Sequence, residues 1–187
     1  MIRVTALLLL VGTSTVAQVT KTAASTTAGA PTIGPVRTFK IAPGTFTTIE
    51  KRFDHQLTNL FDLNDPLDLL GYNRGVYLDG YGVVFTTELS LVITPRPTPF
   101  VQTISKELAD KVRRRKIERL PFLKAIMKEM MRSAAMTFIQ IPSDQQVVMV
   151  ARFLYEPWED RNGMPSQILM RADRKSAMAG DIHVEEQ

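Results

Sequence analysis

The stretch GVYLDGYGVVFTTELSLVI, residues Gly75 to Ile93, contains the longest run in which apolar and polar side chains alternate. A strand places successive side chains on opposite faces, so this period predicts a strand with one buried face and one solvated face. One face carries Val83, Phe85, Thr87, Leu89, Leu91 and Ile93, and the other carries Thr86, Glu88 and Ser90. The pair Asp79-Gly80 favours a tight hairpin, although a bulge within one long strand would give the same pattern.

Helical patterns lie on both sides of this stretch. Between residues 45 and 63, apolar side chains recur every three or four positions, which predicts an amphipathic helix. A second helical period runs from Ile104 to Phe138, and Pro121 interrupts it. Because proline removes a backbone donor and clashes with the preceding turn, we expect either a kinked helix or two helices that meet near Leu120.

Two further strands are expected beyond the second helical region. Residues 146–156 form a nearly continuous apolar run, as expected of a strand that is buried on both faces. Residues 167–173 alternate, with Ile168, Met170 and Ala172 on one face. The order of elements predicts an α+β fold, in which an antiparallel sheet of three to four strands packs against helices on one face.

The first residues, MIRVTALLLLVGTSTVAQ, combine a charged start at Arg3, an apolar run from Val4 to Val11 and small residues before Ala17. This order is typical of a cleavable secretory signal peptide, so we expect cleavage after Ala17 and export to a periplasm or to the cell exterior. The apolar run is shorter than the roughly 20 residues that span a bilayer, and we expect no transmembrane span in the mature chain. An uncleaved anchor or a buried first helix is the alternative.

Composition divides the chain into four parts. Residues 1–17 are the expected signal peptide. Residues 18–43 are rich in Thr, Ala and Pro and have too few large apolar side chains to offset their ordering entropy, so we expect a flexible linker. Residues 44–175 are expected to form a single α+β domain, and residues 176–187 a polar C-terminal tail that frays.

The positive charge of the chain is local. Residues 101–138 contain ten Lys or Arg and four Asp or Glu, whereas the rest of the chain after Ala17 contains twelve and fifteen. The charge is densest in KVRRRKIER, residues Lys111 to Arg119, which we call the basic segment. If the protein binds an anionic partner, we expect this segment to make the contacts. The candidate residues are Lys111, Arg113, Arg114, Arg115, Lys116 and Arg119. A solvated helix face is the alternative, and nucleic acid is not an expected partner of an exported chain.

Residues with metal-binding or nucleophilic chemistry are few. The chain has no cysteine, which excludes disulfides, thiolate metal sites and a cysteine nucleophile. Oxygen donors alternate at Asp62, Asn64, Asp65 and Asp68. Their spacing does not fit a calcium-binding loop, so we interpret them as turn residues, with a weak cation site as the alternative. We predict no cofactor and no metal site.

Aromatic side chains leave two alternatives open. Tyr72, Tyr77 and Tyr81 surround the glycines of the hairpin stretch, where they either cover exposed backbone or stack on sugars or bases. Trp158 stands in a polar loop, where it either anchors the loop to the domain or forms a lip for a sugar.

These features favour a non-catalytic envelope or secreted interaction protein, because no paired acid and base stand in a recognisable context. A hydrolase that acts on an envelope or wall polymer is one alternative, with Glu88, Glu159 or Asp160 as candidate carboxylates. A peripheral protein that binds an anionic membrane surface through the basic segment is another. The expected partner is an anionic envelope component or a protein, and the sequence carries no signal for the oligomeric state.

Overall fold

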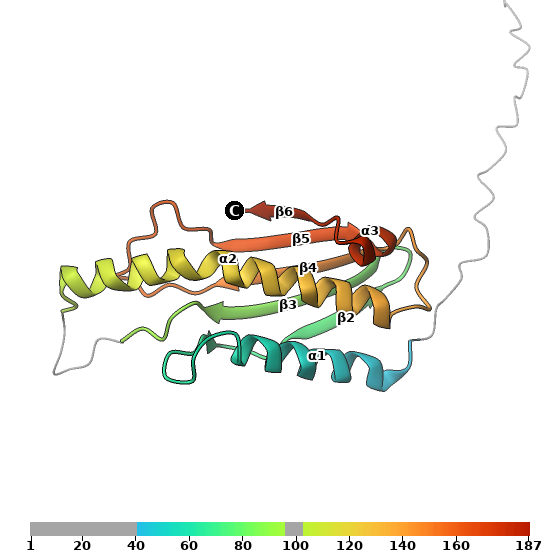
Figure 1. The fold of residues 1–187 in the computed structure, drawn as a ribbon, viewed down its shortest axis with the longest axis horizontal. Helices are drawn as coiled ribbons and strands as arrows, with labels where there is room; N and C mark the ends of the chain where they lie inside the picture. Colours follow the sequence, from blue (N-terminus) through green and yellow to red (C-terminus); the bar gives the residue numbers. More distant parts are fainter. Residues whose placement is uncertain (1–40, 96–102) are drawn as a thin grey trace, which may run out of the picture. The chain divides into compact units, whose positions relative to one another are not determined.

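A computed structural model describes residues 41–95 and 103–187, which form three helices and six strands (Figure 1). The helices are α1 (Pro43–Thr58), α2 (Lys106–Thr137) and α3 (Arg174–Ala179). The strands are β1 (Asp68–Leu69), β2 (Arg74–Leu78), β3 (Gly82–Ser90), β4 (Gln146–Phe153), β5 (Gln167–Asp173) and β6 (His183–Glu186). The predicted α+β class is confirmed, while the predicted signal peptide and all but the end of the predicted linker lie outside the described residues.

The alternating stretch of sequence forms β3. Phe85 and Leu89 are buried, whereas Thr86 and Glu88 are exposed, as the period of two predicts. The alternation ends before Ser90, because Ser90, predicted on the solvated face, is 5% exposed, and Ile93, predicted on the buried face, is 56% exposed. The strand therefore has one face in the core and one face toward solvent.

The Asp79-Gly80 pair lies in the turn of a β-hairpin. Leu78 at the end of β2 pairs with Gly82 at the start of β3, and the Tyr81 N–H donates to the Leu78 carbonyl at 3.0 Å. Gly80 has a φ of +73°, a left-handed conformation that glycine adopts at little cost. The hairpin prediction is confirmed, and the alternative of a bulge within one strand is wrong.

The sheet has the order β1-β3-β4-β5-β6, and β2 also pairs with β3. β3 and β4 run parallel and are joined through α2, while the other pairs are antiparallel. The prediction of an antiparallel sheet with three to four strands is therefore wrong in strand number and in its central pairing. β1 has two residues and β6 has four, which is too short for a period to be recognised. A single strand–helix–strand unit does not by itself distinguish parallel from antiparallel pairing.

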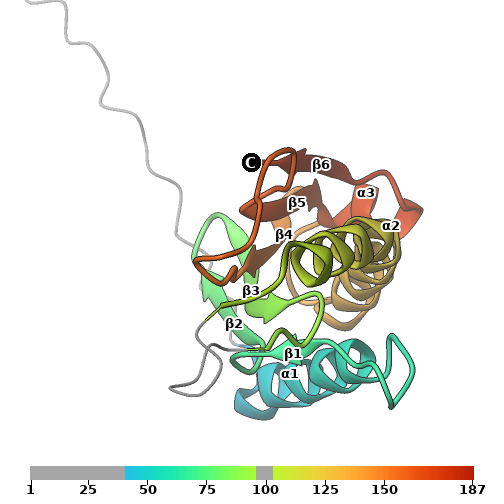
Figure 2. The ribbon, with the colours of Figure 1, turned by 90° about the vertical axis from the view of Figure 1, so that its left-hand side faces the viewer.

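The helices cover one face of the sheet, as predicted. Figure 2 shows α2 along one side of the strands and α1 beside β1 and β2. Apolar side chains from these helices and from the inner face of the strands form one core. Its largest fully buried members are Ile49, Phe53, Leu57, Phe85, Leu89, Leu91, Leu123, Met127, Met130, Met131 and Phe138. No helix of the described residues covers the opposite face, which we call the open face.

α2 is one continuous helix that includes Pro121. It begins after Ser105, whose side chain accepts a hydrogen bond from the Leu108 N–H at 3.2 Å. Pro121 and Ile117 are both exposed. The Ile117 carbonyl does not form its usual helical hydrogen bond, because Pro121 has no backbone N–H. Because water reaches this side of the helix, the helix continues without burying an unpaired carbonyl. Two separate helices are not formed.

The fraying expected for residues 176–187 is not observed. The Asp173 carboxylate caps α3 by accepting from the Ser176 N–H at 2.8 Å, and the helix ends at Gly180 with a φ of +86°. β6 then pairs with β5 and adds a further strand to the sheet. A helix of six residues and a strand of four give no periodic signal, which is why the sequence pattern did not reveal them.

Gly82 lies where the hairpin meets the central parallel pair. Its φ of +136° is rare for residues with a side chain, and a Cβ there would overlap the Gln146 backbone on β4. We expect Gly82→Ala to lower the free energy of unfolding by about 3 kcal/mol, measured by urea denaturation. Gly71→Ala, where nothing lies close to an added Cβ, should change it by less than about 0.5 kcal/mol. Equal stability of the two variants would contradict the close approach of β3 and β4.

Candidate functional site

The basic segment lies in the N-terminal half of α2, and helical geometry distributes its cations around the helix. Lys116 and Arg119 are on the buried side, with 1% and 8% of their surfaces exposed. Lys111 and Arg114 are exposed, and the other two arginines are half-buried. The six candidate residues therefore do not share one face.

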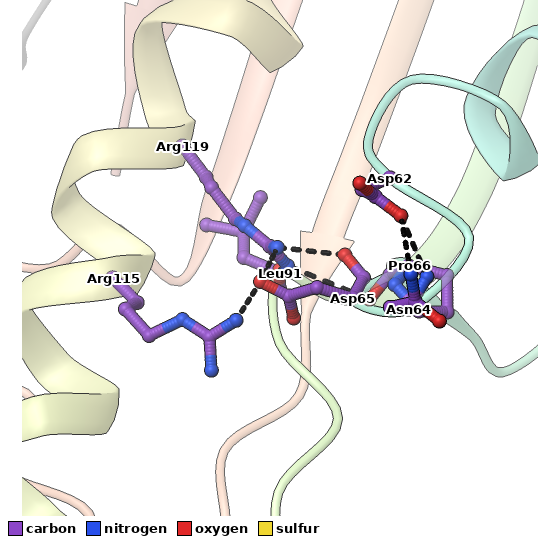
Figure 3. A network of polar contacts seen from close by, with 7 residues as sticks. All are labelled: Asp62, Asn64, Asp65, Pro66, Leu91, Arg115 and Arg119. Carbon is purple, nitrogen blue, oxygen red and sulfur yellow. Dashed lines mark hydrogen bonds and ion pairs between the residues drawn. The ribbon is translucent and has the colours of Figure 1, made fainter.

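Arg119 and Arg115 bind the loop that joins α1 to β1 (Figure 3). Both guanidinium groups contact the Asp65 carboxylate. Arg119 also donates to the backbone carbonyl of Asp65 at 2.7 Å and to that of Leu91 at 2.6 Å. Its guanidinium carbon lies 4.3 Å from the ring centre of Phe61. Arg119 thereby ties together α2, the loop before β1 and the segment that follows β3.

Asp62 and Asn64 act as turn residues in the same loop (Figure 3). The Asp62 carboxylate accepts from the Asn64 backbone N–H at 2.9 Å and from the Asn64 side-chain amide at 3.2 Å. These contacts, together with the ion pairs of Asp65, support the interpretation of this oxygen-rich run as turn chemistry. Within residues 41–95 and 103–187, no three His, Cys, Asp or Glu side chains are grouped to hold a metal ion.

Lys116 pairs with Glu159 inside the protein. The Lys116 Nζ lies 2.6 Å from the Glu159 Oε2, and 2% and 4% of the two side chains are exposed. The ammonium group also lies 4.7 Å from the ring centre of Tyr155. Burial lowers the pKa of Lys116, while the bond to Glu159 opposes this shift. Burial, followed by the negative charge of Glu159, raises the pKa of Tyr155 to about 12. The pair thus fixes the loop that follows β4 to α2.

Arg113 contacts the same loop. Its Nε lies 3.3 Å from the Asp160 carboxylate, and it donates to the Asn162 carbonyl at 2.7 Å. Four of the six candidate cations are therefore engaged by oxygen atoms of the same chain. Among the residues that the structure describes, Lys111 and Arg114 have no ion-pair partner.

The carboxylates considered for hydrolysis each balance a cation. Glu159 and Asp160 hold the cations of α2 described above. Glu88 on β3 places its Oε1 3.5 Å from a guanidinium nitrogen of Arg152 on β4. None of these carboxylates is therefore left without a cationic partner.

The open face presents side chains in rows that cross the strands. Arg74 on β2, Thr86 on β3 and Val150 on β4 are register partners in one row. Glu88 on β3 and Arg152 on β4 are partners in the next row. The first row has the uncharged Thr86 and Val150 beside Arg74, whereas the second is charged, and both rows lie near the C-terminal ends of β3 and β4.

Two adjoining pockets form a groove over this part of the open face. Their volumes are about 660 and 650 Å³, and both are lined by Arg152 and Gln167. We call the combined hollow the open-face groove. Its principal polar and aromatic residues are Tyr72, Arg74, Glu88, Arg152, Arg161 and Gln167.

The groove contains three arginines from separate parts of the chain. Arg74 lies on β2, Arg152 on β4 and Arg161 in the loop after β4, and all three are exposed. Glu88 is the one carboxylate among the described residues that line the groove. Sequence reasoning missed this group because strand pairing, rather than sequence proximity, brings the arginines together. The available signals were Glu88, a charged residue on the solvated side of an alternating strand, and Tyr72, whose ring is one of those considered for stacking on sugars or bases.

The tyrosines near the hairpin differ in exposure. Tyr72 is 72% exposed, and the Arg74 guanidinium carbon lies 5.9 Å from its ring centre. Tyr77 is half-buried, and its hydroxyl lies 3.2 Å from the Gln145 side-chain oxygen. Tyr72 is therefore the tyrosine of this group that presents a ring to the open-face groove.

Two carboxylates of α1 close the outer edge of β2. The Gly75 N–H donates to Glu50 at 2.8 Å, and the Asn73 N–H donates to Asp54 at 2.8 Å. The Asn73 side-chain amide donates to the same Asp54 oxygen at 2.7 Å. A strand that added to this edge would need these N–H groups, so α1 blocks such pairing.

Comparison with protein-family models, with curated proteins and with solved structures found no match to this chain. Within the ranges described, none of the helices has the length and apolar character needed to cross a membrane.

The Lys116–Glu159 pair gives a prediction about stability. Lys116→Met leaves a buried, unpaired Glu159 carboxylate, so we expect the free energy of unfolding to fall by about 3–5 kcal/mol. The double variant Lys116→Met, Glu159→Leu removes both charges of the pair and should recover most of that loss. Arg114→Met, at an exposed position of the same helix, serves as the control and should change stability by less than about 0.5 kcal/mol. Chemical denaturation measures all three, and an additive loss in the double variant would contradict the coupling.

Proposed function

We propose that the chain is an exported, non-catalytic interaction protein and that its partner binds the open face of the sheet. The observation that carries this proposal is a sheet with helices on one face and the open-face groove on the other. Each pocket of the groove has the volume of a typical ligand site and combines aromatic and polar side chains. Such a lining suits recognition of a partner at the protein surface.

Exposed apolar side chains on β2 support the open face as the interaction surface. Val76 and Leu78 are 49% and 45% exposed, and Tyr81 in the turn is 45% exposed. Val76 and Leu78 alternate with half-buried residues, so they share a face of β2 with Arg74 of the groove. Neighbouring exposed apolar groups commonly mark interaction sites.

The two alternative functions have less support. For a hydrolase, Glu159 is buried in its ion pair with Lys116, Asp160 contacts Arg113, and Glu88 has no second carboxylate beside it among the described residues that line the groove. For a membrane-binding role of the basic segment, four of its six cations are already engaged within the chain. The open face therefore accounts better for an interaction surface than the basic segment does.

Export is the second part of the proposal, and it is supported by the charged, apolar and small-residue order of the first residues. We expect protein purified from its native host to begin at Gln18, because cleavage after Ala17 removes the signal peptide. Intact mass measurement checks this outcome. A dominant cytoplasmic species that retains Met1 would contradict export.

Binding through the open face can be tested sterically without changing charge. Thr86 is an exposed residue in the lining of the groove, and Thr86→Trp should fill part of the hollow. We expect the wild-type protein to co-sediment with the cell-envelope fraction of its host and the variant to bind about tenfold more weakly, equivalent to about 1.4 kcal/mol.

The matched control is Thr47→Trp, the same substitution at an exposed position of α1. It should bind like the wild type. Loss of binding in both variants, or in neither, would contradict a role for the open face, as would a wild-type protein that stays in the supernatant.

A further inference from the structure

The charge of the open-face groove is positive and available to a ligand. Its lining contains Arg74, Arg152 and Arg161 against the single carboxylate of Glu88. The Glu88–Arg152 pair spans 3.5 Å, with 51% and 69% of the side chains exposed. A solvent-exposed pair of this kind contributes little to stability, so an anionic group can replace Glu88 at little cost. The basic segment differs, because Lys116 and Arg119 are buried and are already paired with Glu159 and Asp65.

The groove lies on the face of the sheet, which determines how a ligand can be held. Backbone N–H and C=O groups of β3, β4 and β5 are paired within the sheet. The outward N–H groups of Asn73 and Gly75 at the β2 edge are taken by α1. An extended peptide binds by adding a strand to an edge, and these two N–H groups are not available to it. A ligand over the face of the sheet is held by side chains.

The side chains available fit acidic sugars. Guanidinium groups bind carboxylates through paired N–H donors, and Gln167 and Thr86 offer bonds to hydroxyl groups. Tyr72 presents a largely exposed ring beside Arg74, which can lie against the apolar face of a sugar ring. Two adjoining pockets that share Arg152 and Gln167 give the site the extended form that a chain of such sugars needs.

We infer that the open-face groove binds an acidic polysaccharide, with sugar carboxylates on Arg74, Arg152 and Arg161 and a sugar ring on Tyr72. This inference rests on the proposed binding role of the open face and adds the class of ligand to it. Because the contacts are exposed charge pairs, the affinity should fall as the salt concentration rises.

The experiment measures calorimetric binding of oligogalacturonate to the chain lacking residues 1–17, at low and at physiological salt. The variant Arg74→Gln, Arg152→Gln should bind at least about tenfold more weakly, because it loses charge-assisted hydrogen bonds to the sugar carboxylates. Lys111→Gln, Arg114→Gln removes the same charge from exposed positions of α2 and should bind within about twofold of the wild type. Unchanged thermal unfolding of both variants verifies that the fold is retained.

Two comparison ligands separate sugar recognition from simple charge attraction. A neutral glucose oligomer lacks the carboxylates and should not bind, and polyglutamate lacks the sugar rings and should bind about tenfold more weakly than oligogalacturonate. If polyglutamate binds as tightly as oligogalacturonate, the ligand is not recognised as a sugar. If the groove variant and the α2 variant lose the same amount of affinity, the binding site is not the groove. If oligogalacturonate does not bind while envelope binding still depends on Thr86, the ligand class is wrong and the proposed function stands.

Discussion

Two cations on the buried side of α2 constrain the rest of the structure. A charge removed from water must be matched by nearby oxygen atoms, and the chain supplies them to Lys116 and Arg119 from two different loops. The loop before β1 brings Asp65, and the loop after β4 brings Glu159. Arg161 of the open-face groove lies in the loop of Glu159, and Tyr72 follows β1, which comes after the loop of Asp65. Ion pairs made with α2 therefore anchor the loops that lie next to these groove residues in the chain.

Elements with a clear period could be predicted from the sequence, and elements fixed by tertiary contacts could not. The alternation around Phe85, the Asp79-Gly80 turn and the strand at 167–173 all appear where the pattern places them. The charge of the basic segment misled, because a sequence shows that Lys116 is basic and does not show that Glu159 neutralises it from a distant loop. The groove could not be predicted, since its arginines become neighbours only through strand register and loop placement.

The sheet leaves one face without a helix and has N–H groups at one of its edges engaged by α1. Glu50 and Asp54, one helical turn apart on α1, occupy the outward N–H groups beside β2. The proposed recognition at the open face would use side chains, which distinguish ligands by charge and hydrogen-bonding pattern. Val76 and Leu78 remain exposed next to this protected edge, so α1 also limits the risk that an apolar strand pairs with another chain.

Parallel pairing of β3 with β4 joins positions far apart in the chain, such as Gly82 with Gln146. α1, β2 and β3 are close together in the chain and can contact one another early. The inner side of β3, with Phe85 and Leu89, is buried completely only after α2 and β4 have packed against it. Closing so long a loop is the slow kind of step in folding, because its entropy cost precedes the contacts that repay it. During that interval an apolar strand is exposed to other chains, which favours aggregation over folding at high protein concentration.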